Sequence, residues 1–374
     1  MFRNPMKKIL FSATALVAVV SLVLAGCGDD NDSEGASSDE KPLIVVTTNI
    51  LGDVVTNMVG DSFDVETIMP PGSDPHDFQA SAQQVQMMMS ADLLIVNGAN
   101  FEEGMLDVIE NAESDGVMIF EATSVISQLE GSDDHSDHGG HDDHDDHEGH
   151  DDHDEEKDHD DHEGHDDHDE EKDHHDHEGH DHDEEKDHDD HEGHDHGGID
   201  PHFFTDPARM AIVAQELSEV LAANFPDADQ GFVSTANDYV QQLQDLDSEV
   251  EETLSVISSD KRLLVTNHAV FAYFADRYSF TILGEIIPSS STLASASAQQ
   301  LASLAEEIKE SQVKAIFADA SSSDALAQTL ADEVNDVKVI NLYTESLGDP
   351  GSSGDSYIDM IRFNAEAIAS ALVE

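Results

Sequence analysis

Short apolar runs alternate with amphipathic segments along most of the chain. The first run, residues 43–50, is apolar and rich in β-branched side chains, which is typical of a strand buried on both faces of a parallel sheet. The alternation predicts an α/β domain with a mostly parallel sheet. In this part of the chain we expect strands at 43–50, 63–69, 92–97 and 116–120, and helices at 53–59, 81–90 and 102–111.

A second α/β pattern occupies the last part of the chain, after a helix predicted at 207–224. Its apolar runs again have strand length, and the segments between them have the apolar spacing of helices. The expected strands are 262–266, 281–287, 313–317 and 337–342, and the expected helices are 270–278, 297–311, 324–335 and 357–372.

One long amphipathic helix is predicted between the two patterns, at 228–258. Its apolar positions recur every three or four residues from Phe232 to Ile257, forming a single stripe. Such a helix would be about 45 Å long, which suits a rigid connection between two lobes. We therefore expect an N-terminal lobe built from 42–130 and 199–227, the linking helix, and a C-terminal lobe at 259–374.

The distribution of charge marks residues 131–198 as different from the rest of the chain. The chain has 374 residues and a net charge of −69, which excludes electrostatic binding to nucleic acids or anionic membranes. Residues 131–198 hold 20 of the 23 histidines, in an acidic repeat that runs through 147–159 and recurs at 162–174. A repeat without apolar positions cannot stack into a solenoid, so we expect a disordered insertion on a surface loop.

Dense imidazole and carboxylate groups predict weak metal sites in this insertion, of about micromolar affinity. One hypothesis is that the tract captures zinc or senses its abundance and passes ions to a tighter site. The alternative is an expanded, solvated loop without a necessary role. The repeated candidate ligands are His135, His141, His147, His150, His162, His165, His177, His180, His191 and His194.

The first residues indicate export. Basic residues precede an apolar stretch at 9–24, which is the pattern of a signal peptide at 1–26. Cys27 is the only cysteine, so it forms no intrachain disulfide, and the small residues before it resemble a bacterial lipobox. Lipidation of Cys27 would leave 27–41 as a flexible tether. An ordinary cleaved signal with an incidental cysteine is the alternative.

Only three histidines lie outside the insertion: His76, His202 and His268. His76 and His202 each end the tripeptide Asp-Pro-His, and all three follow predicted strands or precede predicted helices. Ligands bind at that edge of an open α/β sheet, so two facing lobes would bring the three rings together. Three imidazoles favour Zn²⁺ over hard ions. Asp74 and Asp200 could accept the second ring N–H of the histidine that follows each of them.

A tetrahedral site needs a fourth ligand. Acidic residues near strand ends in the second lobe are candidates, and composition does not choose among them. A lone histidine is more often structural than a ligand, but the repeated Asp-Pro-His favours the metal hypothesis. The candidate fourth ligands are Asp319, Glu345 and Glu285.

Four segments together resemble the zinc/manganese solute-binding lipoproteins of ABC importers (ZnuA/TroA-like), over residues 42–374 apart from the insertion. Segments 72–78, 200–207 and 265–274 look like the family's three histidine-bearing ligand loops. Segment 341–348, followed by 354–357, looks like the region of the fourth ligand, a carboxylate. The match falls on Glu345, where the family usually has Asp. Phe204 and Gly104 also stand where Trp is frequent.

The resemblance implies two α/β lobes joined by a rigid helix, with a metal ion held between them by His76, His202, His268 and Glu345. It implies a monomer, anchored by lipid at the outer face of the cytoplasmic membrane or in the periplasm, that hands the metal to an ABC permease and its ATPase. Histidine at position 268 and the histidine-rich insertion are similar to the zinc members, because manganese members tend to carry Glu at that position.

We therefore expect a Zn²⁺-binding importer component rather than an enzyme. A Mn²⁺-specific protein of the same class is the nearest alternative. An extracellular zinc buffer or adhesin would need no permease. A zinc hydrolase would need a general base beside the metal, and the sequence has no His-Glu-x-x-His pattern.

Overall fold

The computed structural model describes residues 41–131 and 198–373. The predicted signal peptide, Cys27 and nearly all of the tether precede these residues, and the histidines of the insertion lie between the two ranges. Those predictions fall outside the described residues and stay predictions.

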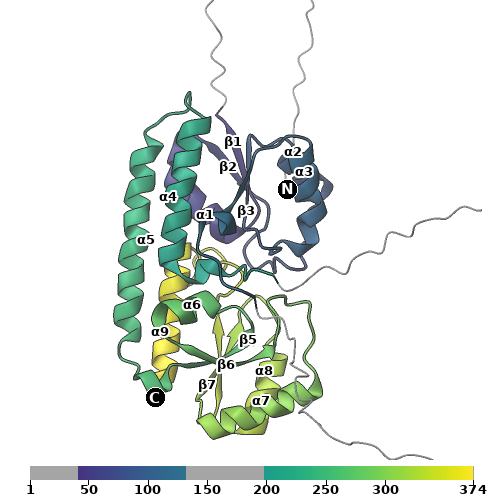
Figure 1. The fold of residues 1–374 in the computed structure, drawn as a ribbon, viewed down its shortest axis with the longest axis vertical. Helices are drawn as coiled ribbons and strands as arrows, with labels where there is room; N and C mark the ends of the chain where they lie inside the picture. Colours follow the sequence, from purple (N-terminus) through teal and green to yellow (C-terminus); the bar gives the residue numbers. More distant parts are fainter. Residues whose placement is uncertain (1–40, 132–197, 374) are drawn as a thin grey trace, which may run out of the picture. The chain divides into compact units, whose positions relative to one another are not determined.

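Two four-stranded parallel sheets form the framework, which confirms the predicted α/β fold class (Figure 1). Their strand orders, β2-β1-β3-β4 and β6-β5-β7-β8, place the first strand of each pattern inside the sheet. The first sheet contains β1 (Leu43–Val46), β2 (Asp64–Thr67), β3 (Leu93–Val96) and β4 (Ile119–Glu121). The second contains β5 (Leu263–His268), β6 (Thr281–Ile287), β7 (Ala315–Asp319) and β8 (Lys338–Leu342).

The first strand is shorter than its apolar run predicts. β1 ends at Val46, and α1 (Asn49–Val59) begins three residues later rather than at residue 53. The reason is local, because the Thr48 side chain accepts a hydrogen bond from the backbone N–H of Leu51 and caps the helix. One continuous apolar run thus supplies both a buried strand and the buried first turn of a helix.

The helices of the described ranges lie beside the two sheets. The linking helix predicted at 228–258 is shorter, because α5 spans Phe232–Leu254; its 23 residues correspond to about 35 Å. No helix in these ranges is both long and apolar enough to cross a membrane. The other helices are α2 (Ala82–Met89), α3 (Leu106–Ser114), α4 (Pro207–Asn224), α6 (Ala272–Tyr278), α7 (Ala298–Ser311), α8 (Ala325–Val334) and α9 (Tyr357–Val373).

Helix α5 runs past both sheets and packs against α1, α4 and α9 (Figure 1). One buried apolar cluster includes side chains from both sheets, such as Val46 of β1 and Leu264 of β5. Alternate strand positions face separate clusters, as Val45 and Val265 do. The two lobes therefore share a core, while each sheet also buries its other face against its own helices.

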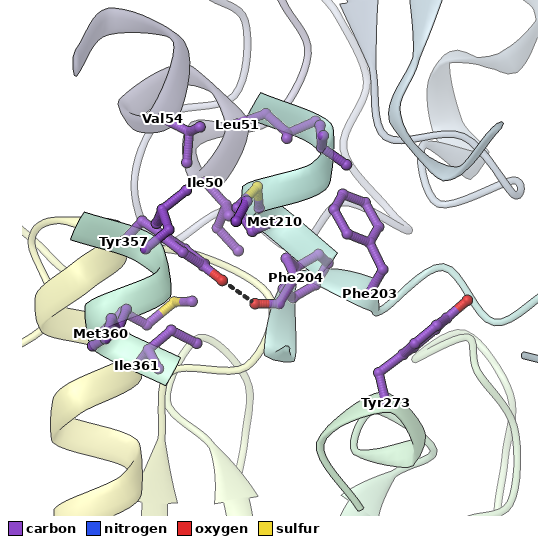
Figure 2. Close-up of a cluster of buried hydrophobic side chains, with 14 of the residues drawn as sticks. Ile50, Leu51, Val54, Phe203, Phe204, Met210, Tyr273, Tyr357, Met360 and Ile361 are labelled. Carbon is purple, nitrogen blue, oxygen red and sulfur yellow. Dashed lines mark hydrogen bonds between the residues drawn. The ribbon is translucent and has the colours of Figure 1, made fainter. Parts of the chain in front are cut away.

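Tyr357 connects the lobes within this shared core. Figure 2 shows its ring beside Ile50 and Met360, with the hydroxyl directed at the backbone of Phe204. The hydroxyl donates a hydrogen bond of 2.8 Å to the Phe204 carbonyl, and both residues are buried. Phe204 follows His202 closely, so this bond fixes a predicted ligand segment to α9.

We predict that Tyr357→Phe lowers the free energy of unfolding by about 1–3 kcal/mol, because it leaves the buried Phe204 carbonyl without a donor. Tyr239→Phe is the matched control, since no described residue forms a hydrogen bond with the buried Tyr239 hydroxyl. Urea unfolding of both variants with metal chelated measures the difference. An equal loss of unfolding free energy in the two variants would contradict a stabilising role for the bond between the Tyr357 hydroxyl and the Phe204 carbonyl.

Candidate metal centre

The four predicted ligands come from four separate segments. His76 lies in the loop after β2, and His202 precedes a short 3-10 helix, Phe203–Thr205, that leads into α4. His268 is the last residue of β5, and Glu345 lies in the loop after β8. Three of the four thus lie at or after the carboxyl ends of parallel strands, the edge at which ligands bind in this class of sheet.

These four side chains converge, and all four are buried. One ligand atom from each lies within 4.8 Å of the other three. Glu345 is central: its Oε1 is 2.5 Å from His268 Nε2 and 3.3 Å from His202 Nε2, and its Oε2 is 3.6 Å from His76 Nε2. Ligand atoms about 2.0 Å from a tetrahedral Zn²⁺ stand about 3.3 Å apart, so small shifts would suffice to hold one ion.

The cluster contains buried polar atoms without a hydrogen-bond partner in the described ranges. They include His76 Nε2, His202 Nε2 and Glu345 Oε2, which face the centre of the cluster. Leaving such atoms unsatisfied costs about 1–3 kcal/mol each, and native proteins contain few of them. Potential ligand atoms that meet in a space shielded from water are the arrangement that a cation completes.

The electrostatics of the cluster couple the imidazole rings to the carboxylates beside them. Burial alone would lower the pKa of His76, but the hydrogen bond with Glu103 and the nearby negative charge of Glu345 raise it to about 10. Burial would also lower the pKa of His202, whereas the charges of Glu345 and Asp200 raise it to about 9. Burial opposes ionisation of Glu345, yet the neighbouring His202 and His268 hold its pKa well below the usual range. Protons thus take the place of a metal charge.

Asp200 supports its histidine as the sequence predicts. Its Oδ1 lies 2.7 Å from His202 Nδ1 and also accepts the backbone N–H of His202, at 2.8 Å. A carboxylate on Nδ1 leaves Nε2 as the ligand atom and fixes the ring orientation. Asn97 positions the same loop, because its side-chain amide donates to the carbonyl of Pro201 at 3.0 Å.

The prediction that Asp74 accepts the second ring N–H of His76 was wrong. Asp74 Oδ1 accepts the backbone N–H of His76 at 3.0 Å, and its Oδ2 accepts the hydroxyl of Thr292 at 2.8 Å. The ring Nδ1 of His76 instead lies 3.0 Å from Glu103 Oε1. Glu103 is distant in sequence and follows another glutamate, so no sequence signal marks it as the partner.

The other two candidate fourth ligands lie outside the cluster. Asp319 accepts hydrogen bonds from Ser321 and from the Thr344 hydroxyl, so both of its oxygens are already engaged. Glu285 lies on β6, half-buried, and burial raises its pKa. Among the described residues, Glu345 is the carboxylate that meets the three rings.

Aromatic side chains enclose two of the rings. Phe101 makes edge contacts with His76 and His202, at centroid distances of 5.2 and 5.5 Å, and Phe204 packs on His202 at 5.9 Å. Gly104 is constrained by packing, because a Cβ there would lie 2.2 Å from the Phe78 carbonyl oxygen. A tryptophan therefore cannot occupy position 104 while the His76 loop keeps this course.

Comparison with known proteins places the chain in a family. The profile of the family described as "ZnuA: Zinc-uptake complex component A periplasmic" matches residues 44–371. The chain belongs to this family. The resemblance to this family is thereby confirmed, and the ZnuA-family protein is a solute-binding component of metal uptake rather than a member of an enzyme family.

Several relatives of this chain carry manganese in their names. The manganese ABC transporter substrate-binding lipoprotein PsaA of Streptococcus anginosus is 24% identical over 98% of this chain and 99% of its own. The manganese-binding lipoprotein MntA of Halalkalibacterium halodurans is 24% identical over 98% of this chain and 99% of its own. The solved periplasmic zinc-binding protein TroA of Treponema pallidum shares the fold, with a TM-score of 0.66 and 24% identity over 89% of this chain and 99% of its own.

We predict that Asp200→Asn weakens metal binding about 10- to 100-fold, because it removes the carboxylate that fixes the His202 ring. Asp74→Asn is the matched control: Asp74 has the same place in its Asp-Pro-His, but its hydrogen bonds go to the His76 backbone and to Thr292. Competition with a chromogenic chelator measures both affinities. Similar losses in the two variants would refute a specific role for the Asp200–His202 contact.

Proposed function

We propose that this ZnuA-family protein is the extracytoplasmic substrate-binding component of an ABC importer that captures Zn²⁺ between its two lobes. His76, His202, His268 and Glu345 are the proposed ligands. The observation that carries the proposal is the meeting of buried, unpartnered ligand atoms from both lobes at one point. The bound ion is cargo, which a membrane permease with its ATPase then receives.

The donor set supports zinc over manganese. Three imidazole nitrogens and one carboxylate suit a four-coordinate Zn²⁺, whereas Mn²⁺ favours sites richer in oxygen and of higher coordination number. Asp319, a buried carboxylate of the second lobe, has both oxygens hydrogen-bonded elsewhere. Manganese remains the second candidate, because PsaA and MntA carry it in their names.

A catalytic zinc site is less well supported. Catalytic zinc ions have three protein ligands and keep a position for water, while this cluster offers four ligand atoms. Each of the four side chains is also nearly inaccessible, which suits retention of an ion better than contact with a substrate.

The proposed location follows from the N-terminal sequence. Lipidation of Cys27 would anchor the mature protein, as a monomer, at the outer face of the cytoplasmic membrane or in the periplasm. The relatives named lipoproteins support this proposal. An extracellular buffer or adhesin would share the anchor. Loss of growth in chelator-limited medium after gene deletion, restored by zinc, distinguishes an importer component from both.

We predict one tight Zn²⁺ site in addition to the weak sites of the insertion. Calorimetry of the full chain and of a chain lacking 132–197 should show the same tight site, with the weak sites absent after deletion. His268→Ala should abolish the tight site in both, because it removes a ligand. Titration of the shortened chain with Zn²⁺ and Mn²⁺ in competition measures the preference.

Two results would contradict this prediction. Preferential retention of Mn²⁺ by the shortened chain would overturn the choice of metal. A tight site that disappears with 132–197 but survives His268→Ala would place the site in the insertion. Glu285→Gln is the control for a nearby acidic residue outside the cluster, and it should keep the tight site.

We predict that Zn²⁺ binding at pH 7.5 releases protons. The raised pKa values of His76 and His202, about 10 and 9, mean that these rings carry protons at that pH in the metal-free protein. Metal ligation requires neutral imidazole, so the protons must leave and affinity must rise with pH through this range. Calorimetry in two buffers with different ionisation enthalpies counts the protons. Release of none would show that the rings are already neutral.

A further inference from the structure

The side-chain amide of Asn49 lies between two of the loops that carry proposed ligands. Asn49 is the first residue of α1 and is buried. Its Nδ2 donates to the carbonyl of Pro70 at 3.0 Å, in the loop that leads to His76. The same Nδ2 donates to the hydroxyl of Ser346 at 2.7 Å, and its Oδ1 accepts the backbone N–H of Leu347 at 2.8 Å, in the loop of Glu345.

The two loops also contact each other at this point. The backbone N–H of Gly72 donates to the Ser346 hydroxyl at 2.8 Å and approaches the Leu347 carbonyl at 3.1 Å. Ser346 is buried and directly follows Glu345. The amide of one residue from the first lobe therefore sets the spacing between a loop of its own lobe and a loop of the other lobe.

Glu345 depends on this spacing more than the histidines do. Its carboxylate contacts the ligand rings, and no hydrogen bond from another described residue orients it. The loop before it is held by its own lobe, since Asn364 bonds the backbone of Tyr343 and Asp319 bonds Thr344. After Glu345, the next two residues are held by Asn49 from the opposite lobe.

We propose that Asn49 is a positioning residue for metal capture, which sets the reach of the Glu345 carboxylate toward the ring of His76. The inference rests on the proposed function of the four ligands. It adds that closure of the two lobes and completion of the ligand set are one event, because the amide that joins the loops also places the fourth ligand.

A purely structural contact between lobes would behave differently. Asp53 provides the matched control, because it lies on the same helix and its Oδ2 accepts the backbone N–H of Tyr357 from the other lobe, at 2.9 Å. That bond joins Asp53 to the first residue of α9 and not to the loop of Glu345. Within the described ranges, Asp53 forms no hydrogen bond with any of the four ligand side chains. Asp53→Ala should lower stability and leave zinc affinity within about 3-fold of the unaltered protein.

The test measures Zn²⁺ affinity of the full chain by competition with a nanomolar chelator, so that micromolar sites stay empty. We expect Asn49→Ala to weaken binding about 10- to 100-fold, as loss of an outer-shell partner does. Ser346→Ala should also weaken zinc binding, because it removes the hydroxyl that accepts the Asn49 amide. This variant replaces Asn49→Ala in the test if Asn49→Ala folds poorly. In each variant, Co²⁺ absorption at one equivalent should show weaker d–d bands of changed energy, reporting an altered ligand geometry.

A double-mutant cycle separates positioning from general stability. In the background of Glu345→Gln, which removes the charged ligand, Asn49→Ala should cost less than about 2-fold in further affinity, because the two residues act as one unit. Equal costs of Asn49→Ala in both backgrounds would overturn the inference, as would an unchanged Co²⁺ spectrum or an equal loss in Asp53→Ala. Failure of the unaltered protein to bind Zn²⁺ tightly would instead overturn the proposed function.

Discussion

Three imidazoles and one carboxylate share a space from which water is almost excluded. This burial determines how the charges and hydrogen bonds of the four side chains can be satisfied. Buried polar atoms without partners are costly, and a buried charge is retained only when an opposite charge or a metal accompanies it. Here the neighbouring carboxylates, Glu345 among them, raise the pKa values of His76 and His202, and no described residue forms a hydrogen bond with His76 Nε2 or His202 Nε2. A divalent cation that displaced the ring protons would balance the charge of Glu345 and bind these ring nitrogens.

The fold provides the confinement by joining the lobes through a common core. Parallel strands deliver ligands to one edge of each sheet, but neither sheet alone supplies the full set. The contact of Tyr357 with Phe204, the passage of α5 along both sheets and the Asn49 amide bring the two edges together. The ligand atoms are consequently buried because the lobes touch, and a separated pair of lobes would expose them.

The sequence predicted the parts of this arrangement that depend on local pattern. Apolar periodicity located the strands, and it was wrong at residues 47–50 because the Thr48 cap, not hydrophobicity, ends the strand. The repeated Asp-Pro-His marked His76 and His202. Glu345 could not be distinguished from Asp319 by composition, since what separates them is the hydrogen bonds that Asp319 accepts from the Ser321 backbone N–H and the Thr344 hydroxyl. Glu103 and Asn49 were not predicted, because their contacts join segments far apart in the chain.

The support around each ring follows the stiffness of the element that carries it. His76 and His202 lie on irregular segments, and each has a carboxylate on Nδ1, from Glu103 and Asp200. His268 lies in β5, where pairing with Ile287 of β6 fixes its backbone, and no described residue bonds its Nδ1. A strand limits the directions that a side chain can take, whereas a loop does not, so a ligand on a loop needs a second contact to hold its angle. Glu345 also lies on a loop, and the cross-lobe contacts of the residues that follow it provide the equivalent restraint through the backbone.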